Sequence, residues 1–215
     1  MPLVLTPEKA RIFRITHVAN VPWILQNGVH CRNSNVRDPA FREIGNPDLI
    51  AKRTRRVVPI APHGTLSDYV PFYFTPRSPM LFNIKTGYNG VPQTPMSEIV
   101  VLVSSLLRLR ELSVGFVFTD RHAYLQMATD SFSSDLADLR KIDWGILQAS
   151  DFRRDPDDPA KIERYQAEAL VHQRVPVEAL TGLACYSKER REELEAELTR
   201  QPVSLQVVVR PSWYF

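Results

Sequence analysis

The sequence predicts a single globular domain in which helices alternate with short strands. With 215 residues, the chain has the usual length of one domain. Its composition, 44% hydrophobic and 24% charged residues, is that of a protein with a sizeable core and a hydrated surface. Short valine-rich segments bounded by polar residues recur along the chain, and segments with helical patterns separate them. We therefore expect mixed sheets.

The first expected elements are a strand and a short helix. Residues 10–17 read as extended, and Asn20 can then cap a helix with Pro22 in its first turn and Gly28 at its end. Residues 30–68 are polar, basic and interrupted by glycine and proline, apart from a helical turn near residues 47–56. We expect this long region to be a functional loop, such as a lid or a binding loop.

Residues 69–83 are unusually rich in proline and aromatic side chains. Pro71, Pro76 and Pro79 exclude a regular helix here, because proline fixes φ and lacks an N–H donor. The segment would suit a rigid wall for a flat ligand, with Arg77 as its charged group. A buried strand interrupted by prolines, with Arg77 reaching solvent, is an equally good interpretation.

Further elements are expected in the second half of the chain. The expected strands cover residues 99–103, 114–119 and 205–209, and the expected helices cover residues 121–127, 132–139 and 187–200. Ser187 can cap the last helix, whose interleaved charges indicate a solvated face. The aspartates of residues 151–159 lack the ligand spacing of a calcium loop, so we interpret them as a turn before a helix from Ala160.

Several classes of protein lack their usual signals in this sequence. No apolar run approaches the roughly 20 residues of a membrane-spanning helix, and no secretory signal is visible. Cys31 and Cys185 make a disulfide framework improbable, so a cytoplasmic location is expected. Glycine-rich dinucleotide and phosphate-loop motifs are missing. The histidines lack the short spacing of metal ligands, so we expect no metal site.

Positive charge is concentrated early in the chain. The formal net charge is +3, and residues 30–56 hold seven lysines or arginines against three acids. The planar guanidinium of arginine suits phosphates, so this basic patch indicates a nucleotide or nucleic-acid partner. A high arginine content can equally reflect genome composition, so the charge alone does not decide the function.

Five short motifs, in this order along the chain, resemble a known family. They are Ile15-Thr16-His17 followed by Asn20, the basic run 52–56, the proline-aromatic segment 69–83, Phe118-Thr119-Asp120-Arg121-His122, and the run 166–172. Together they resemble the DarT group of ADP-ribosyltransferases, the toxins of DarT and DarG systems. The resemblance continues to the closing residues 210–215. It implies an α+β fold in which two small, mainly antiparallel sheets flank an NAD cleft, with residues 1–215 as one domain.

The resemblance also implies an activity. A member of this group would transfer ADP-ribose from NAD to a thymine or guanine base in single-stranded DNA and release nicotinamide. NAD would be a co-substrate, no metal would take part, and the cognate partner would be an antitoxin with ADP-ribosylglycohydrolase activity. Two alternatives stay open: a noncatalytic module that binds single-stranded nucleic acid, and the same transferase acting on RNA or protein.

Glu168 is the expected catalytic carboxylate. In a strand from residue 167, Glu168 and His172 share one face, whereas residues 162–172 also fit a helix on which Glu168 would be exposed. The resemblance assigns Glu168 the position of the family's catalytic glutamate. It would accept a hydrogen bond from the nicotinamide ribose and stabilise the positive charge that forms as the glycosidic bond breaks.

Arg53 is the second expected catalytic residue. A run of basic residues is usually a solvated helix face, but the resemblance aligns Arg53 with the family's active-site arginine. That arginine helps to position the diphosphate, and a fixed cation favours the anionic form of the target base. Arg55 is the reserve candidate, and Arg55, Arg56 and His122 are assigned to DNA. For His122, a capped helix start is the competing interpretation.

The resemblance assigns further residues to the NAD pocket. They are Thr16, His17, Asn20 and Arg53 as polar groups, with Tyr69, Tyr73 and Phe74 as stacking groups. His17 could equally be a core histidine. The sequence departs from the family at Arg14, where some relatives carry a histidine that helps to hold NAD, and Arg77 receives no role.

Overall fold

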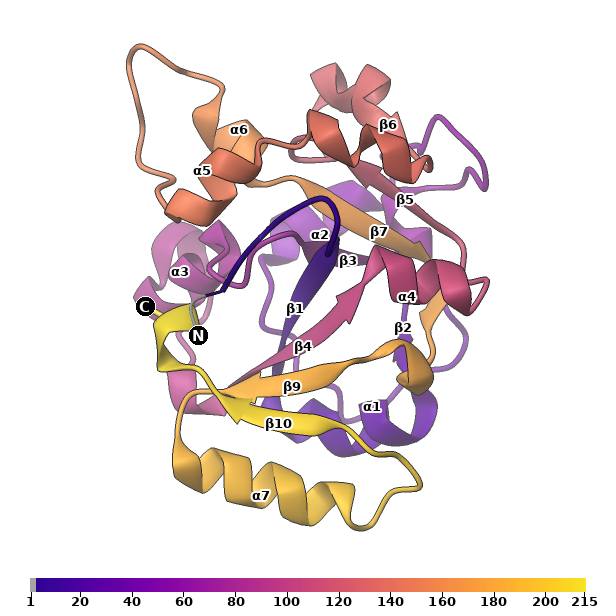
Figure 1. The fold of residues 1–215 in the computed structure, drawn as a ribbon, viewed down its shortest axis with the longest axis vertical. Helices are drawn as coiled ribbons and strands as arrows, with labels where there is room; N and C mark the ends of the chain where they lie inside the picture. The colour runs from indigo at the N-terminus through magenta and orange to yellow at the C-terminus, as the bar shows by residue number, and fades with distance from the viewer. Residues whose placement is uncertain (1–2) are drawn as a thin grey trace.

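Residues 3–215 are described by a computed structural model, apart from the side chains of residues 126 and 127. The strands are β1 (Arg11–His17), β2 (Val29–His30), β3 (Tyr69–Tyr73), β4 (Ile99–Ser105), β5 (Phe116–Thr119), β6 (Phe132–Ser133), β7 (Glu168–His172), β8 (Arg174–Val175), β9 (Gly182–Cys185) and β10 (Gln206–Val209). The α-helices are α1 (Val21–Asn27), α2 (Pro47–Arg53), α3 (Pro79–Thr86), α4 (Leu106–Glu111), α5 (Trp144–Ala149), α6 (Lys161–Tyr165) and α7 (Lys188–Leu198). Figure 1 shows their arrangement.

An eight-stranded sheet in the order β10-β9-β4-β1-β3-β7-β5-β6 forms the centre of the fold, and β2 pairs with β8 in a small second sheet. Pairing is antiparallel except between β10 and β9, so the α+β class and the mainly antiparallel pairing are confirmed. The two small sheets expected to flank the cleft are two halves of this one sheet. They meet at β1 and β3, whose only register pair among the described residues is Phe13 with Tyr73.

The two halves separate beyond this pair because of Pro71. If the register continued, Pro71 on β3 would lie opposite Ile15 on β1. Proline has no N–H to donate to the neighbouring strand, so one of the hydrogen bonds that would continue the ladder there cannot form. The Pro71 carbonyl instead accepts a hydrogen bond from Arg14 Nη1 at 3.0 Å, which places a side chain in the gap between the strands. By contrast, β1 and β4 pair along the full length of β1.

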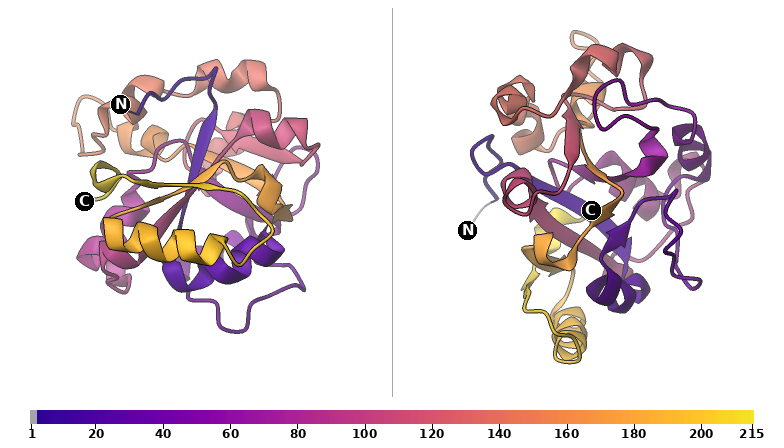
Figure 2. Two further views of the ribbon diagram at one scale, coloured as in Figure 1. Left: turned by 60° about the horizontal axis from the view of Figure 1, so that its bottom comes forward. Right: turned by 90° about the vertical axis from the view of Figure 1, so that its right-hand side faces the viewer.

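The core lies around β4, β1 and β9. Ile99, Val100, Val101 and Leu102 of β4 are all fully buried, as expected for a strand covered on both faces. Helix α7 packs on β9 and β10, where it lies along the edge of the sheet in both Figure 1 and Figure 2. Ser187 caps α7 by accepting from Arg190 N, as the sequence predicted.

Most of the predicted elements are confirmed, but two predicted helices are absent, and α3 begins at Pro79, where the prolines were expected to exclude a helix. Proline fits the first turn of a helix, where its missing N–H has no intrahelical partner. Residues 121–125 form turns and residues 126–131 a 3-10 helix, where an α-helix was expected over 121–127. Residues 132–139 were also predicted to be helical, but Phe132 and Ser133 form β6. Pairing of β6 with β5 satisfies their backbone groups and overrides the local helical pattern. Asn20 precedes α1 as expected, yet its side chain makes no cap hydrogen bond.

The described helices include none that is long and apolar enough to cross a membrane. In residues 3–215, no cluster of three or more His, Cys, Asp or Glu side chains is placed to hold a metal ion. Cys31 and Cys185 are both buried free thiols.

Candidate functional site

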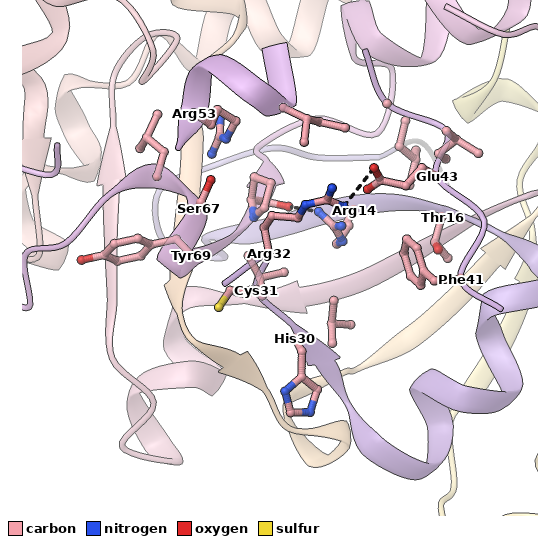
Figure 3. Close-up of a pocket in the computed structure, with 18 of the residues that line it drawn as sticks. Arg14, Thr16, His30, Cys31, Arg32, Phe41, Glu43, Arg53, Ser67 and Tyr69 are labelled. Atoms are coloured by element: carbon pink, nitrogen blue, oxygen red, sulfur yellow. Dashed lines mark hydrogen bonds and ion pairs between the residues drawn. The ribbon is translucent and has the colours of Figure 1, made fainter. Parts of the chain in front are cut away.

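A cavity of about 420 Å³ opens where β1 and β3 separate. Strand β1 contributes Arg14, Ile15 and Thr16 to its wall, and β3 contributes Tyr69, Val70, Pro71 and Tyr73 (Figure 3). The opposite wall is the loop between β2 and α2, which contributes many side chains between residues 30 and 50. The long polar loop expected from the sequence therefore covers a cavity.

Glu168 lies in the wall of this cavity at the start of β7. The strand interpretation is confirmed, and the side chain is only 2% exposed. Its Oε2 accepts a hydrogen bond from Arg53 Nη1 at 2.9 Å, and its Oε1 lies 2.9 Å from His122 Nδ1. The sequence places these three residues far apart, and the fold joins them through α2, β7 and the loop after β5.

The Glu168 carboxyl is ionised. Burial alone would raise its pKa, but the charge of Arg53 and the hydrogen bond from His122 outweigh burial and lower the pKa to about 2. His122 Nδ1 lies 2.9 Å from Oε1 and 3.3 Å from the backbone N–H of Tyr124, which is placed to donate to it. Because the contact with the ionised Oε1 is the shorter one and needs a donor, we assign the proton to Nδ1, which leaves Nε2 as the other ring position. The site thus holds a buried negative charge at neutral pH, paired with two nitrogen donors.

The loop after β5 completes the surroundings of Glu168. The backbone N–H of Ala123 donates to Glu168 Oε1 at 3.3 Å, and Thr119 Oγ1 accepts from the Glu168 backbone N–H at 3.4 Å. The backbone N–H of His122 donates to the carbonyl of Glu163, which ties the loop to α6. Sequence analysis missed Ala123, because a backbone donor leaves no signal in the residue type.

Arg53 is presented by the last turn of α2. The Asn46 side chain caps this helix by accepting from Leu49 N, and Pro47 occupies its first turn. Arg53 is 9% exposed, and its Nη2 is buried without a hydrogen-bond partner among the described residues. Ser67 Oγ, in the same cavity wall, is also buried without a described partner. Unsatisfied buried polar atoms that line a cavity indicate polar contacts with a ligand.

Arg14 adds a second cation to the cavity. Burial and the nearby charge of Arg53 lower its pKa to about 10, against a smaller opposing effect of Glu43. Arg14 therefore places a guanidinium in the cavity wall. Arg32 and Glu43 on the covering loop form an ion pair at 3.1 Å across the cavity mouth, as Figure 3 shows.

Four of the residues predicted to bind NAD line the cavity. Thr16, Tyr69 and Tyr73 face it, together with Arg53. Burial raises the pKa of Tyr69 to about 12, and its hydroxyl donates to the His63 carbonyl. Burial and the charge of Glu168 also raise the pKa of Tyr73, so both phenols are neutral.

The other two predicted NAD residues lie behind the cavity wall. His17 Nε2 contacts Glu98 Oε2 at 3.0 Å, and its Nδ1 accepts from the backbone N–H of Ala19. Asn20 donates to Thr16 Oγ1 at 3.1 Å and bonds both the N–H and the carbonyl of Arg42. Asn20 thus holds the covering loop against β1.

The proline-aromatic segment supports the site only in part. Tyr69 and Tyr73 line the cavity, but the expectation that Phe74 stacks on the ligand is wrong. Phe74 is fully buried and packs edge-on against Phe118 and Trp144. Arg77, which received no role from the sequence, places its guanidinium 4.5 Å from the ring centroid of Phe215.

The residues predicted to contact DNA occupy different environments. Arg55 is exposed, whereas the Arg56 guanidinium donates to the carbonyls of Ala123 and Leu125. His122 belongs to the Glu168 site, and its ring makes an edge contact with Tyr124 at 6.4 Å. Beside the cavity mouth lies an open groove, which sequence analysis did not predict. The groove is lined by Asn46, Asp48, Leu49, Lys52, Asn89 and Tyr124.

Comparisons with known proteins find similar proteins along most of the chain. A family model described as "ssDNA thymidine ADP-ribosyltransferase, DarT" matches residues 13–215. A DNA ADP-ribosyl transferase of Escherichia coli O127:H6 (strain E2348/69 / EPEC) is 53% identical over 211 residues, covering 98% of this chain and 96% of that protein. A fusion of a DNA ADP-ribosyl transferase with a DNA ADP-ribosyl glycohydrolase from Thermosipho africanus is 21% identical, over 97% of this chain and 50% of that protein.

Solved structures are similar along the whole chain. Thermus sp. 2.9 DarT in complex with ADP-ribosylated ssDNA is 34% identical and superposes with a TM-score of 0.89, covering 100% of both chains. The same protein in complex with NAD+ superposes with a TM-score of 0.85 at 36% identity, over 97% of this chain and 99% of that chain.

Proposed function

Since the chain belongs to the DarT family of ADP-ribosyltransferases, we propose that it transfers ADP-ribose from NAD to a thymine or guanine base in single-stranded DNA and releases nicotinamide. The observation that carries the proposal is the ionised, buried Glu168 held by Arg53 and His122 in the wall of a cavity. The relatives solved with NAD+ and with ADP-ribosylated ssDNA supply the substrate classes.

The cavity residues fit NAD as a co-substrate. Two buried polar atoms, Arg53 Nη2 and Ser67 Oγ, have no described partner and line the cavity, so they are available to hydroxyl or phosphate oxygens. Arg14 lies close enough to Arg53 for their charges to interact, which suits a diphosphate between them. Tyr73 and Tyr69 offer ring faces and neutral hydroxyls to a ribose or a nicotinamide ring.

Glu168 would stabilise the transition state of the transfer. The bond from the anomeric carbon to the nicotinamide nitrogen breaks with its electron pair going to nicotinamide, and a base nitrogen bonds to that carbon and loses its proton. Positive charge develops on the ribose between these events. A fixed carboxylate in a buried site opposes this charge without reorganisation of solvent, which is the most effective form of electrostatic catalysis.

Arg53 and His122 would act on the side of the acceptor base. A guanidinium beside a base N–H favours the anionic base, because opposite charges stabilise one another. Arg53 is held by Glu168 through Nη1 only, so Nη2 stays available for this role. His122 donates through Nδ1 to Glu168, and its Nε2 is the ring position left for the base or its proton.

The open groove beside the cavity is the proposed path of the DNA strand. It shares Asn46 and Leu49 with the cavity wall, so a strand in the groove reaches the same chamber. Tyr124 offers a ring for base stacking, and Lys52 offers a charge for phosphate. Exposed Arg55 lies three residues after Lys52 and would contact the backbone. In single-stranded DNA the acceptor base is already unpaired, so the free-energy cost of extruding a base from a duplex is avoided.

The proposal also covers the antitoxin, the domain organisation and the location of the protein. A cognate ADP-ribosylglycohydrolase is the proposed antitoxin, as the fused glycohydrolase of the Thermosipho relative suggests. Residues 1–215 form one transferase domain, supported by a sheet whose strands come from Arg11 to Val209. We place the protein in the cytoplasm, where NAD and DNA are available and free thiols such as Cys31 and Cys185 persist.

The experiment is to incubate the purified protein with NAD and a panel of short DNA oligonucleotides and to weigh the products by mass spectrometry. Addition of one ADP-ribose, with release of one nicotinamide, is expected on oligonucleotides that contain the target base. Panels that lack thymine or lack guanine identify that base. If no DNA gains ADP-ribose while an RNA or a protein does, the proposed acceptor is wrong. NAD-independent DNA binding with no product of any kind would contradict the enzyme assignment.

A further inference from the structure

Arg56 belongs to the basic run assigned to DNA, but its side chain points into the protein. Its Nη2 donates to the Leu125 carbonyl at 2.7 Å and to Thr129 Oγ1 at 3.1 Å, and its Nε donates to the Ala123 carbonyl at 3.4 Å. All three acceptors belong to the segment between β5 and β6. A single guanidinium therefore bridges several turns of that segment.

The backbone of Arg56 is tied to the other side of the site. Its N–H donates to the Arg53 carbonyl at 3.3 Å, and its own carbonyl accepts from the backbone N–H of Leu66 at 2.9 Å. Arg56 thus follows directly on the turn that ends α2 and carries Arg53. The side chain of Arg56 therefore links the segment after β5 to this turn.

These contacts close a ring around the catalytic carboxylate. Arg53 holds Glu168 Oε2, and Glu168 Oε1 is held by His122 Nδ1 and Ala123 N–H. The same Ala123 presents its carbonyl to Arg56, whose backbone returns to Arg53. Without Arg56, the two donors on Oε1 would rest on a segment that had lost these contacts with the turn after α2.

We infer that Arg56 is a positioning residue, which fixes the segment after β5 so that His122 and Ala123 hold Glu168, and that it is not a phosphate contact. The inference rests on the proposed function for its kinetic readout. The contrast is with Arg55, whose side chain is exposed and makes no described hydrogen bond with the protein. Adjacent arginines would then serve opposite purposes, one toward the protein and one toward the strand.

Lysine separates the two roles at position 56. It keeps the positive charge, so a phosphate contact would survive Arg56→Lys in large part. Lysine lacks the planar fork that bonds several acceptors at once, so a bridge across Ala123, Leu125 and Thr129 would be lost. Misplacement of a catalytic group by about 1 Å can cost roughly 100-fold in rate. We expect kcat to fall about 10- to 100-fold in both Arg56→Lys and Arg56→Ala.

The test compares five variants in steady-state ADP-ribosylation of a DNA oligonucleotide. Arg56→Lys and Arg56→Ala should lower kcat with the KM for DNA changed less than about threefold. Arg55→Ala should raise the KM for DNA and weaken the salt dependence of binding. Arg110→Ala, which removes an exposed arginine of α4, is the matched control and should behave as wild type. Thr129→Val, which deletes one acceptor, should lower kcat about two- to fivefold.

Hydrogen exchange supplies a readout that does not depend on the DNA reaction. Backbone amides of residues 121–131 should exchange faster in Arg56→Lys than in the wild type, with exchange in β4 and β9 unchanged. Wild-type kcat in Arg56→Lys, or a raised KM with a weaker salt dependence as in Arg55→Ala, would overturn the inference. If wild type itself fails to modify DNA, the proposed function fails, and faster exchange in residues 121–131 still decides whether Arg56 holds this segment.

Discussion

Glu168→Gln is the sharpest perturbation of this site. Glutamine has nearly the same shape as glutamate, and its carbonyl oxygen can still accept from Arg53 Nη1 or from His122. The substitution therefore removes the negative charge and leaves the packing of β7 in place. A loss of rate in this variant measures the electrostatic contribution of the carboxylate.

The size of the catalytic effect follows from the burial of the charge. Two unit charges about 4 Å apart, with the effective dielectric constant of about 20 that suits protein sites, interact by about 4 kcal/mol. If the transition-state ribose carries most of a unit charge at that separation, kcat falls by roughly 1,000-fold, because about 1.4 kcal/mol corresponds to a factor of ten. NAD binding should change far less, since ground-state NAD carries its positive charge on the nicotinamide ring.

The same charge contributes to stability, with a sign fixed by its pKa. The folded pKa of Glu168 is about 2, below the value of 4.5 for the free side chain. A lowered pKa stabilises the fold above the unfolded value and loses that effect as pH falls through the folded value, so the window runs from about pH 4.5 down to about pH 2. The difference corresponds to about 3 kcal/mol at neutral pH. Glu168→Gln should lose up to this amount and show a flatter stability profile in that window.

The assay is single-turnover transfer of ADP-ribose to an oligonucleotide, followed by mass spectrometry, with circular dichroism and urea unfolding on the same preparations. A typical domain is stable by 5–15 kcal/mol, so the variant should remain folded during the assay. Glu178→Gln is the matched control, because Glu178 is exposed and lies outside the cavity lining. It should match wild type in rate and in its urea midpoint.

A rate for folded Glu168→Gln within about tenfold of wild type would refute the electrostatic argument. If Glu168→Gln lost most of its rate but had the same stability as wild type at every pH from 7 to 3, the pairing of Glu168 with Arg53 and His122 in the free protein would be contradicted. The two measurements therefore test the role of the charge and its environment separately.

Three further predictions concern other parts of the molecule. Arg53→Lys keeps the charge but loses the second guanidinium nitrogen, so kcat/KM should fall at least about 100-fold in the same transfer assay; a fall below tenfold would show that one donor is enough. Arg55→Ala should reduce the slope of log K against log salt concentration for single-stranded DNA by about 0.7, measured by fluorescence anisotropy, and an unchanged slope would remove it from the phosphate path. Tyr214→Phe deletes a buried hydroxyl that contacts two strand carbonyls, so urea unfolding should show a loss of about 1–3 kcal/mol with transfer unchanged; equal stability would mean that the bonds are replaced.

Local patterns predicted much of the fold. Pro22, Gly28 and Ser187 mark helix ends that the structure contains, and the valine-rich runs became β4, β5 and β10. The failures occur where long-range pairing decides the conformation. Residues 132–139 look helical, but β5 offers Phe132 and Ser133 a partner strand that no local pattern reveals.

The sequence predicted which charged residues belong to the site, but it did not predict the contacts that hold them in place. Motif resemblance singled out Glu168, Arg53 and His122, and the structure brings their side chains together. Ser67 and the Ala123 N–H were missed, because a serine and an alanine carry no signal before the fold places them at the cavity. Arg56 had the right charge for DNA, and only the carbonyls around it show a different use.

Pro71 gives the cavity an unusual origin. The cavity lies between two strands that are adjacent and antiparallel. A residue with an N–H at position 71 would supply the donor that Ile15 lacks, and the strands could then close from Phe13 toward Thr16. The space for the ligand would be consumed by ordinary sheet formation. The room for a ligand therefore depends on the backbone chemistry of proline at position 71 as well as on the side chains that line the cavity.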